Sequence, residues 1–328
     1  MMKILWTHNW PDERKSMGPF MWTLLEGLRK KNIHIDLYYV GSGYNPNKAL
    51  SNFKKLKLVA KEYDLVHAQY GSLTGYITSK LDMPSLLSIR GSDWHQYIGN
   101  DIKENLHSKI ACYLTRRAIK DYNEIIVMSE RMQKEINRIS HSVINVIPDP
   151  IDLDLFNIEE KKESRKKLFN DESSSPWVLF NTLSKTNPVK RLGLAEQVIE
   201  EVRKSIPNVQ MKIASNIAYK DMPTFINSCD LALCTSTHEG WPNSIKEALA
   251  CGLPFVSTNV SDLDLLSEKS SYCYVSEDNI KEMANGIISI LNNQESINKE
   301  DLRDLVNYMS VDNISDNLIS VYNRMLNK

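Results

Sequence analysis

The stretch between residues 231 and 258 constrains the fold more than any other part of the chain. It opens and closes on two short apolar runs, Leu231–Thr235 and Phe255–Thr258, which have the length and composition of buried parallel strands. Between them lie a polar loop and a short helix, which is predicted to end at Gly252 because glycine commonly follows a helix end. A strand, a loop, a helix and a second strand form the repeating unit of an open α/β sheet, so the stretch predicts a doubly wound α/β domain.

The polar loop and the helix start in this stretch predict a ligand site. Ser244 and Glu247 have the spacing of a capping box, which places the helix start at Ser244. The loop Thr237–Asn243 then lies at the carboxyl end of a strand beside free backbone N–H groups, where open α/β sheets bind anions such as phosphate. Glu239 and Glu247 bracket this site, and a carboxylate can accept two hydrogen bonds from the vicinal diol of a sugar or ribose.

The spacing of these residues resembles the signature of retaining glycosyltransferases of family 4, also called glycosyl transferases group 1. The matching positions are Glu239, Gly240, Pro242, Asn243, Glu247, Ala248, Ala250, Gly252, Pro254 and Val256. The resemblance implies the GT-B fold, in which two doubly wound Rossmann-like domains face each other across a cleft. It also implies that Glu239 lies by the donor sugar and that Glu247 binds the ribose of the nucleotide. The other donor-binding residues expected in this loop are Gly240, Trp241, Pro242, Asn243 and Ser244.

The loop after the apolar run Val178–Phe180 is predicted to supply positive charge to the same site. Lys190 follows this loop at the start of a helix, where an ammonium group can neutralise a leaving diphosphate. The family that the chain resembles uses a basic pair for this purpose, and Lys190 matches its lysine. Ser184 or Lys185 is the candidate for the first member, and Arg191 is a further donor-binding candidate. A solvated basic helix start is the alternative interpretation of Lys185, Lys190 and Arg191.

Polar residues also follow the predicted strands of the first domain. Gly18 precedes a helix and resembles the family's first loop, which faces the donor diphosphate; a plain helix-entry glycine is the alternative. Arg90, Gly91 and Asp93 resemble a family position that often reads His-Gly-x-Asp, and we expect them on the acceptor side. Arg90 replaces the histidine and can clamp an anion, but it cannot act as an acid or base because it stays protonated. His67 is either an acceptor-side residue or a structural one.

The length of 328 residues is sufficient for two domain cores. We place an N-terminal acceptor-binding domain at residues 1–157, since the turn before residue 157 resembles the family's interdomain turn. A nucleotide-sugar-binding domain is expected at residues 158–305. Residues 302–326 are predicted to be helical, and residues 306–328 are expected to cross back to the first domain because Tyr322 resembles the family's last helix.

Composition and charge restrict the partners and the location. No apolar run approaches the roughly 18 residues that span a bilayer, and no signal-peptide pattern opens the chain. The five cysteines form no CxxC pair and are typical of reduced thiols, so we expect a cytoplasmic protein. Residues 1–157 carry four more basic than acidic side chains. This excess predicts weak peripheral association with an anionic membrane, with ordinary solvated helices as the alternative. The basic helix residues concerned are Lys54, Lys55, Lys57, Lys61, Arg116, Arg117 and Lys120.

The predicted function is transfer of a sugar, with retention, from a nucleotide diphosphate-sugar to a hydroxyl of a glycan or lipid-linked glycan. Similar bacterial proteins often extend surface polysaccharides. The candidate catalytic residues are Glu239, Lys190 and Arg90. No cofactor, metal or nucleic acid is expected, because neither a DxD motif nor a His/Cys cluster occurs in a convincing context for a divalent metal site. The resemblance implies that the departing phosphate accepts the acceptor's proton. A nucleotide-sugar 2-epimerase and a non-catalytic nucleotide-sugar-binding protein of the same fold are the alternatives.

Overall fold

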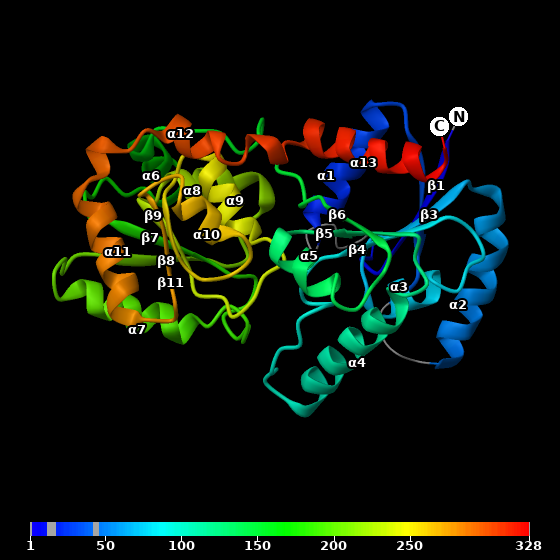
Figure 1. Cartoon of the computed structure of the whole chain (residues 1–328). Coiled ribbons are helices and arrows are strands. Elements are labelled where there is room, and N and C mark those ends of the chain that lie inside the picture. Colours follow the sequence, from blue (N-terminus) through cyan, green and yellow to red (C-terminus); the bar gives the residue numbers. More distant parts are fainter. Residues whose placement is uncertain (1, 12–17, 42–45, 328) are drawn as a thin grey trace. The chain divides into compact units, whose positions relative to one another are not determined.

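The chain folds as two compact units, each built around one parallel sheet (Figure 1). This computed structural model describes residues 2–11, 18–41 and 46–327. The first unit comprises Met1–Pro150 and Val311–Lys328, and the second comprises Ile151–Ser310.

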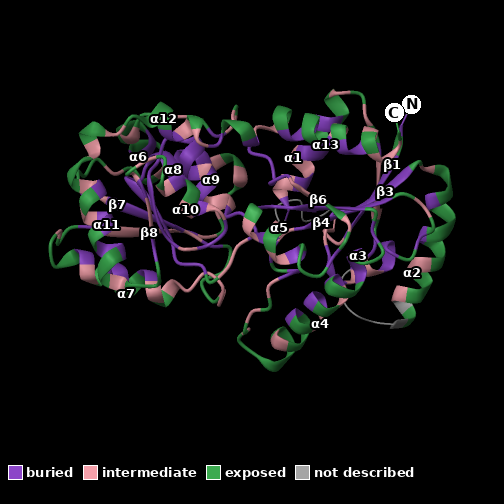
Figure 2. Cartoon of the chain, viewed as in Figure 1, coloured by how far each residue is buried: buried purple, intermediate pink, exposed green. Residues whose placement is uncertain are grey.

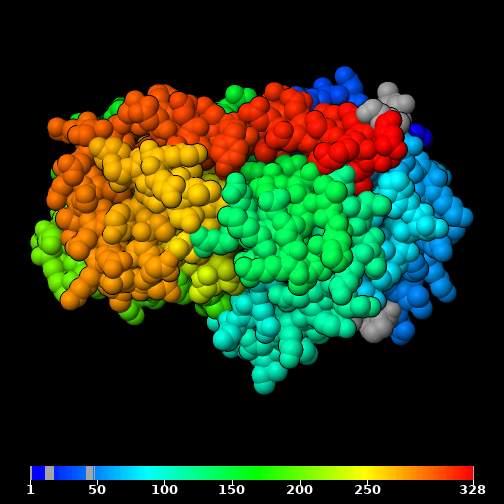
Figure 3. All heavy atoms as spheres, viewed as in Figure 1, coloured from blue at the N-terminus to red at the C-terminus, as the bar shows by residue number. Residues whose placement is uncertain are grey.

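The first unit has the strand order β2-β1-β3-β4-β5-β6, with every pair parallel. Its strands are β1 (Lys3–His8), β2 (His34–Tyr39), β3 (Leu65–Ala68), β4 (Ser85–Ile89), β5 (Glu124–Val127) and β6 (Val143–Val146). Its helices are α1 (Pro19–Lys30), α2 (Pro46–Val59), η2 (Ala60–Glu62), α3 (Ser72–Thr78), α4 (Ile102–Ala118), α5 (Glu130–Ile136) and α13 (Val311–Met325). Helices α1 and α13 cover one face of the sheet, while α2, α3 and α4 cover the other (Figure 1). The start of α4 and the loop before it project from the rest of this unit (Figure 3).

The second unit has the strand order β11-β10-β9-β7-β8, again with parallel pairs. Its strands are β7 (Trp177–Asn181), β8 (Gln210–Ala214), β9 (Leu231–Cys234), β10 (Phe255–Thr258) and β11 (Cys273–Ser276). Its helices are α6 (Lys161–Phe169), α7 (Leu192–Arg203), η3 (Tyr219–Asp221), α8 (Met222–Asn227), α9 (Asn243–Ala250), α10 (Leu263–Ser267), α11 (Ile280–Asn292), η4 (Gln294–Ser296), α12 (Lys299–Asp304) and η5 (Asn307–Met309). Helices α7 and α11 pack together on one face, and α8, α9 and α10 cover the other (Figure 1).

Burial explains why the central strands are continuous apolar runs. Every residue of β3, β4, β9 and β10 is buried, because helices cover both faces of a parallel sheet (Figure 2). In the second unit, Val178 and Leu233 pack with Val198 of α7 and Ile287 of α11 in one core. The predicted doubly wound α/β architecture is therefore confirmed for each unit.

The strand order gives each sheet one switch point, where successive connections leave toward opposite edges. In the first unit this point lies between β1 and β3, and in the second unit it lies between β7 and β9. Loops that follow the two strands at a switch point diverge and leave room for a ligand at the carboxyl edge. This topology selects the loops after β7 and β9 as the candidate site of the second unit.

The chain passes between the units after Pro150 and after Ser310, rather than near residues 157 and 305. The amide of Ile151 donates to the carbonyl of Met309 at 2.9 Å. The Arg303 guanidinium donates to the carbonyls of Leu153 and Phe156 at 2.6 and 2.5 Å. These contacts join the turn at residues 151–156 to the second unit.

Two local predictions about helices were wrong. Residues 302–326 do not form a continuous helical segment, because α12 ends at Asp304 and Ser310 has an extended backbone (φ −54°, ψ 153°) before α13 begins. The capping box is also absent. Helix α9 begins at Asn243 with Pro242 as its N-cap and no side-chain cap, so Ser244 and Glu247 both lie inside the helix. The extended Pro242 (φ −71°, ψ 106°) starts the helix earlier than Ser244 would.

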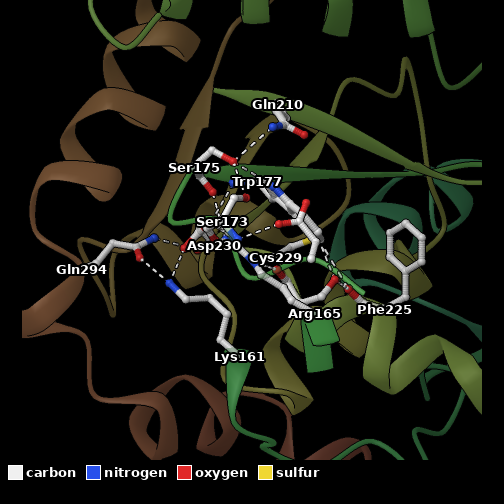
Figure 4. Close-up of polar contacts among 12 residues, drawn as sticks. Lys161, Arg165, Ser173, Ser175, Trp177, Gln210, Phe225, Cys229, Asp230 and Gln294 are labelled. Atoms are coloured by element: carbon white, nitrogen blue, oxygen red, sulfur yellow. Dashed lines mark hydrogen bonds and ion pairs between the residues drawn. The ribbon is translucent and has the colours of Figure 1, made fainter. Parts of the chain in front are cut away.

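A buried ionic cluster holds α6 against the amino-terminal edge of the second sheet (Figure 4). Asp230, which immediately precedes β9, pairs with Lys161 at 2.6 Å and with Arg165 at 2.7 Å, and it accepts a hydrogen bond from the amide of Trp177. Arg165 also donates to the carbonyls of Ser173, Ser175 and Ser228. Because the cluster lies at the opposite edge of the sheet from the switch-point loops, its role is structural.

Candidate functional site

The loops at the second unit's switch point are tied together by backbone and side-chain hydrogen bonds. The amide of Thr237, after β9, donates to the carbonyl of Val189, after β7, at 2.9 Å. The hydroxyl of Thr235 donates to the carbonyl of Lys190 at 2.6 Å. These bonds bring Lys190 next to Glu239.

Lys190 and Glu239 form an ion pair at the carboxyl edge of the sheet. The Lys190 Nζ atom lies 2.7 Å from Glu239 Oε1, and the Ser236 hydroxyl donates to the same oxygen at 2.7 Å. Burial lowers the pKa of Lys190, but the charge and hydrogen bond of Glu239 outweigh it, so the pKa lies above its ordinary value of 10.5. The side chains of Lys190 and Glu239 are still 22% and 18% exposed, so a ligand can reach this charged pair.

Arg191 holds the ends of three strands together. Its backbone is left-handed (φ 51°), and its guanidinium donates to the carbonyls of Thr235 and Ser236 at 2.6 and 3.1 Å. It also forms two bonds with the Asp278 carboxylate after β11, at 2.5 and 2.7 Å. Arg191 therefore supports the loops. Of the other basic-pair candidates, Lys185 is exposed, and the Ser184 hydroxyl pairs with Thr186 at 2.9 Å.

Helix α9 begins at Asn243, four positions after Glu239 in the sequence. None of the described atoms accepts a hydrogen bond from the amides of Asn243 and Ser244, as expected for the first turn of a helix. Trp241 is buried with its ring centroid 5.7 Å from Lys246 Nζ, and the carbonyl of Gly240 accepts the Ser261 hydroxyl at 2.6 Å. These contacts fix the loop before α9, and the free amides favour an anion at its end.

Glu247 lies one turn into α9 and is only partly exposed. Burial raises its pKa from 4.5 to about 7, although the charges of Lys246 and Lys190 act in the opposite direction. Tyr219 of η3 lies near enough that the Glu247 charge adds to the effect of burial in raising the tyrosine's pKa. Nothing in the local sequence pattern relates Tyr219 to α9, so this contact could not be predicted from the sequence.

In the first unit, the predicted acceptor-side residues form a buried polar group at the end of β4. The side chain of Arg90 is 7% exposed and forms an ion pair with Asp149. The Cζ atom of the Arg90 guanidinium lies 4.3 Å from the ring centroid of Phe20. Burial lowers the pKa of Arg90, whereas Asp93 raises it. Asp93 accepts hydrogen bonds from the amides of Arg90, Gly91 and Gly71, and Gly91 has a left-handed backbone (φ 121°).

His67 lies inside the first unit's core, where its ring nitrogens have partners. Its Nε2 atom is 2.8 Å from the Ser88 hydroxyl, and its Nδ1 atom is 2.7 Å from the Tyr322 hydroxyl of α13. The Trp6 indole also donates to that hydroxyl at 2.9 Å. Burial lowers the pKa of His67 well below 6.5, and these contacts favour the structural interpretation of this residue.

The side-chain amide of Gln69 extends this hydrogen-bond network from His67 to the carboxyl edge of the sheet. The Gln69 side chain donates to His67 Nδ1 at 3.0 Å and accepts from the Arg90 guanidinium at 2.9 Å. Arg90 also donates to the Gln69 carbonyl at 2.7 Å. The network therefore joins the C-terminal helix to Arg90, a connection that the sequence analysis missed.

Gly18 caps the amino end of α1, and a Cβ atom at this position would lie 3.2 Å from the Trp10 ring. Gly18 therefore lies at the helix entry, as the alternative interpretation expects. Residues 12–17 of the preceding loop lie outside the described residues. Within the described ranges, no three His, Cys, Asp or Glu side chains cluster as a metal site would require. No described helix is both long and apolar enough to cross a membrane.

Sequence comparison places the family pattern in the second unit. Residues 191–293 match the family model described as glycosyl transferases group 1. The chain is 23% identical over 241 residues to TuaC of Bacillus subtilis (strain 168), whose name assigns it to teichuronic acid biosynthesis as a glycosyltransferase. The match covers 68% of this chain and 60% of that protein.

Solved structures show the same fold over nearly the whole chain. Sucrose-phosphate synthase from Thermosynechococcus elongatus has a TM-score of 0.73 at 13% identity, with 100% of each chain covered. Anabaena HepE in complex with UDP-glucose has a TM-score of 0.73 at 16% identity, covering 99% of this chain and 100% of HepE. The fold is GT-B, and residues 191–293 match the sequence pattern of the glycosyl transferases group 1 model.

Proposed function

We propose that this group 1 GT-B chain is a retaining glycosyltransferase that moves a sugar from a nucleotide diphosphate-sugar to a hydroxyl of a glycan or lipid-linked glycan. The observation that carries the proposal is the accessible Lys190–Glu239 ion pair at the switch point, next in the chain to the free amides at the start of α9. A diphosphate needs positive charge on one side and a sugar needs acceptors on the other, and this pair supplies both.

The chemistry of the donor side follows from the geometry of the pair. Lys190 and the α9 amides would stabilise the charge that develops on the departing diphosphate. Because Lys190 and Ser236 both contact Glu239 Oε1, the Oε2 atom remains to accept a hydroxyl of the donor sugar. The phosphate oxygen would take the acceptor's proton on the face from which it leaves, so no protein base is required and the configuration is retained.

We assign the ribose of the nucleotide to Glu247 and the surrounding donor surface to Trp241, Asn243 and Ser244. An ionised Glu247 accepts two hydroxyl hydrogen bonds, and its raised pKa predicts that binding strengthens as the pH rises through about 7. On the first unit, Arg90 would position the acceptor, while the fully buried Asp93 holds the backbone of Arg90 and Gly91 in place. Arg90 would contribute charge and orientation, since a guanidinium does not exchange protons at neutral pH.

The relatives suggest where to begin with substrates. HepE was solved with UDP-glucose, and TuaC is named for teichuronic acid biosynthesis. UDP-sugars are therefore the first donors to test, and we propose a role in surface polysaccharide synthesis at the cytoplasmic side of the membrane. We also propose that transfer needs no divalent metal, because Lys190 and the helix start can take over the phosphate charge.

The test measures nucleoside diphosphate release from a panel of UDP- and GDP-sugars, with and without glycan acceptors and with and without a chelator. We expect acceptor-dependent release that the chelator leaves unchanged, and a product whose anomeric coupling in NMR matches that of the donor. Lys190→Ala should lose this release, while Lys204→Ala, at the other end of α7, should keep it. Acceptor-independent conversion of the donor would indicate an epimerase. Donor binding without conversion of any panel member would indicate a binding protein.

A further inference from the structure

Helix α4 carries a row of exposed apolar side chains on one face. Ile102 is 84% exposed, Leu106 is 55% exposed and Tyr113 is 62% exposed. Ile98, in the loop before the helix, is 81% exposed. Residues spaced by four and seven positions lie on the same side of a helix, so the three helix residues form one stripe. The opposite side is buried and includes Ala111 and Thr115. This projecting segment is visible in Figure 3.

Hydrogen bonds hold this segment in place, so its apolar exposure belongs to an ordered structure. Asp101 caps the helix by accepting the Glu104 amide at 2.8 Å. The amide of Gly99 donates to the Asn105 side chain at 2.7 Å, and the amide of Tyr97 donates to the Ser108 hydroxyl at 3.1 Å. The loop that carries Ile98 is therefore fixed against the first turns of α4.

Basic side chains border the apolar stripe. Lys103, Lys109, Arg117 and Lys120 are exposed along α4 and just beyond its end. The acidic groups of the same segment, Asp101 and Glu104, both accept hydrogen bonds from amides at the helix start. The segment thus combines an apolar stripe with excess positive charge on a single helix.

We propose that the exposed face of α4, together with Ile98, is the docking surface for an anionic lipid bilayer. An amphipathic helix with this arrangement lies in the plane of the interface, with its apolar side chains among the acyl chains and its basic side chains at the headgroups. Lys109 follows Leu106 by three positions and precedes Tyr113 by four, so this exposed lysine lies on the stripe itself. Lysine is depleted at the centre of protein–protein interfaces, so its position favours a bilayer over a protein partner. The surface would hold the proposed transferase where lipid-linked acceptors are present.

This inference deepens the proposed function, but vesicle binding tests it without any transfer assay. The assay is co-sedimentation of the full chain with phosphatidylcholine vesicles and with vesicles of equal parts phosphatidylcholine and phosphatidylglycerol. We expect binding to the anionic vesicles alone, and loss of most of that binding when salt shortens the screening length. The double variant Ile102→Ser with Leu106→Ser should lower the apparent affinity about tenfold or more.

The matched control is Leu265→Ser with Tyr308→Ser in the second unit. These side chains are 39% and 51% exposed and lie on α10 and η5, away from the basic helices of the first unit. The control should bind vesicles within about twofold of the wild type, and both double variants should keep transfer to a soluble acceptor. Ile98→Ser, which lies outside the helix, provides a second variant should the α4 pair reduce folding in circular dichroism.

Three results would overturn the proposal. The first is equal binding to zwitterionic and anionic vesicles, and the second is wild-type vesicle binding by both the α4 and the Ile98 variants. The third is a wild-type dimer that the α4 variant converts to a monomer with no change in vesicle binding, because the face would then be a contact between copies. Failure of transfer with intact vesicle binding would instead contradict the proposed function.

Discussion

Replacing Glu247 with glutamine should stabilise the protein at alkaline pH while weakening its donor site. Glu247 is partly buried in α9, and burial raises the pKa of its carboxyl from 4.5 to about 7. Glutamine has nearly the same size and carries no charge, so Glu247→Gln removes the cost of holding a carboxylate in this place. Because α9 is capped at Pro242 without a side chain, the substitution removes no cap.

The direction in which the free energy of unfolding changes with pH follows from proton binding. Between pH 4.5 and about 7 the unfolded chain has lost the Glu247 proton while the folded protein keeps it, so the free energy of unfolding falls as the pH rises. Below pH 4.5 the carboxyl is neutral in both states and its stabilising contribution is fully present; above about 7 that contribution is lost. The two pKa values differ by about 2.5, and each pKa unit is equivalent to about 1.4 kcal/mol, so the upper limit of the gain is about 3.5 kcal/mol. Residual solvent contact reduces the expected gain to about 1–3 kcal/mol.

The assay compares thermal melts of the wild type and Glu247→Gln at pH 5 and pH 8. We expect similar melting temperatures at pH 5 and a higher melting temperature for the variant at pH 8, by about 2–10 °C. Glu200→Gln is the control, since the side chain of Glu200 on α7 is 68% exposed. UDP should then raise the melting temperature of the wild type more than that of Glu247→Gln at pH 8, because glutamine places a donor where the ribose needs an acceptor.

Two outcomes would refute this reasoning. A variant that is less stable than the wild type at pH 8, or a difference that does not change with pH, would show that burial does not penalise the Glu247 carboxylate. The variant could instead be more stable at pH 8 and bind the nucleotide as well as the wild type does. This result would agree with the penalty for burying the carboxylate but would contradict the assignment of Glu247 to the ribose.

Three further substitutions test the contacts around the sites. Lys190→Ala should lower kcat/KM about 100-fold or more, equivalent to about 2–4 kcal/mol of transition-state stabilisation; near-normal turnover at saturating donor would place the diphosphate elsewhere. Arg191→Lys keeps the charge but loses the fork that reaches two carbonyls and Asp278, so urea unfolding should show a loss of about 1–2 kcal/mol; unchanged stability would argue against the clamp. Tyr322→Phe leaves the Trp6 indole without its acceptor, and calorimetry should show a loss of about 1–3 kcal/mol; a neutral effect would mean that water replaces the hydroxyl.

Local sequence was sufficient for much of the secondary structure. Strand β10 (Phe255–Thr258) has the predicted bounds and β9 (Leu231–Cys234) ends one residue before its prediction, because a strand buried on both faces must be a short apolar run. Less regular elements were missed: α3 and α10 are short helices, and β11 is a four-residue strand whose apolar and polar residues do not alternate. The start of α9 was misplaced because Pro242 competes with Ser244 as the cap, and only the extended backbone at Pro242 decides between them.

The sequence by itself determined the class of fold and the residue types of the donor loop, since hydrophobic period, helix signals and motif spacing are all local properties. Only the tertiary structure decided which of these residues meet. Lys190 reaches Glu239 because β7 lies beside β9, Arg191 reaches Asp278 across the same edge, and His67 bonds to Tyr322 because α13 returns to the first unit. The exposure of the apolar stripe on α4 was equally undetermined, because periodicity identifies a helix face but not what covers it. Strand order and helix packing arise from the burial of the whole chain, and no local window of sequence contains that information.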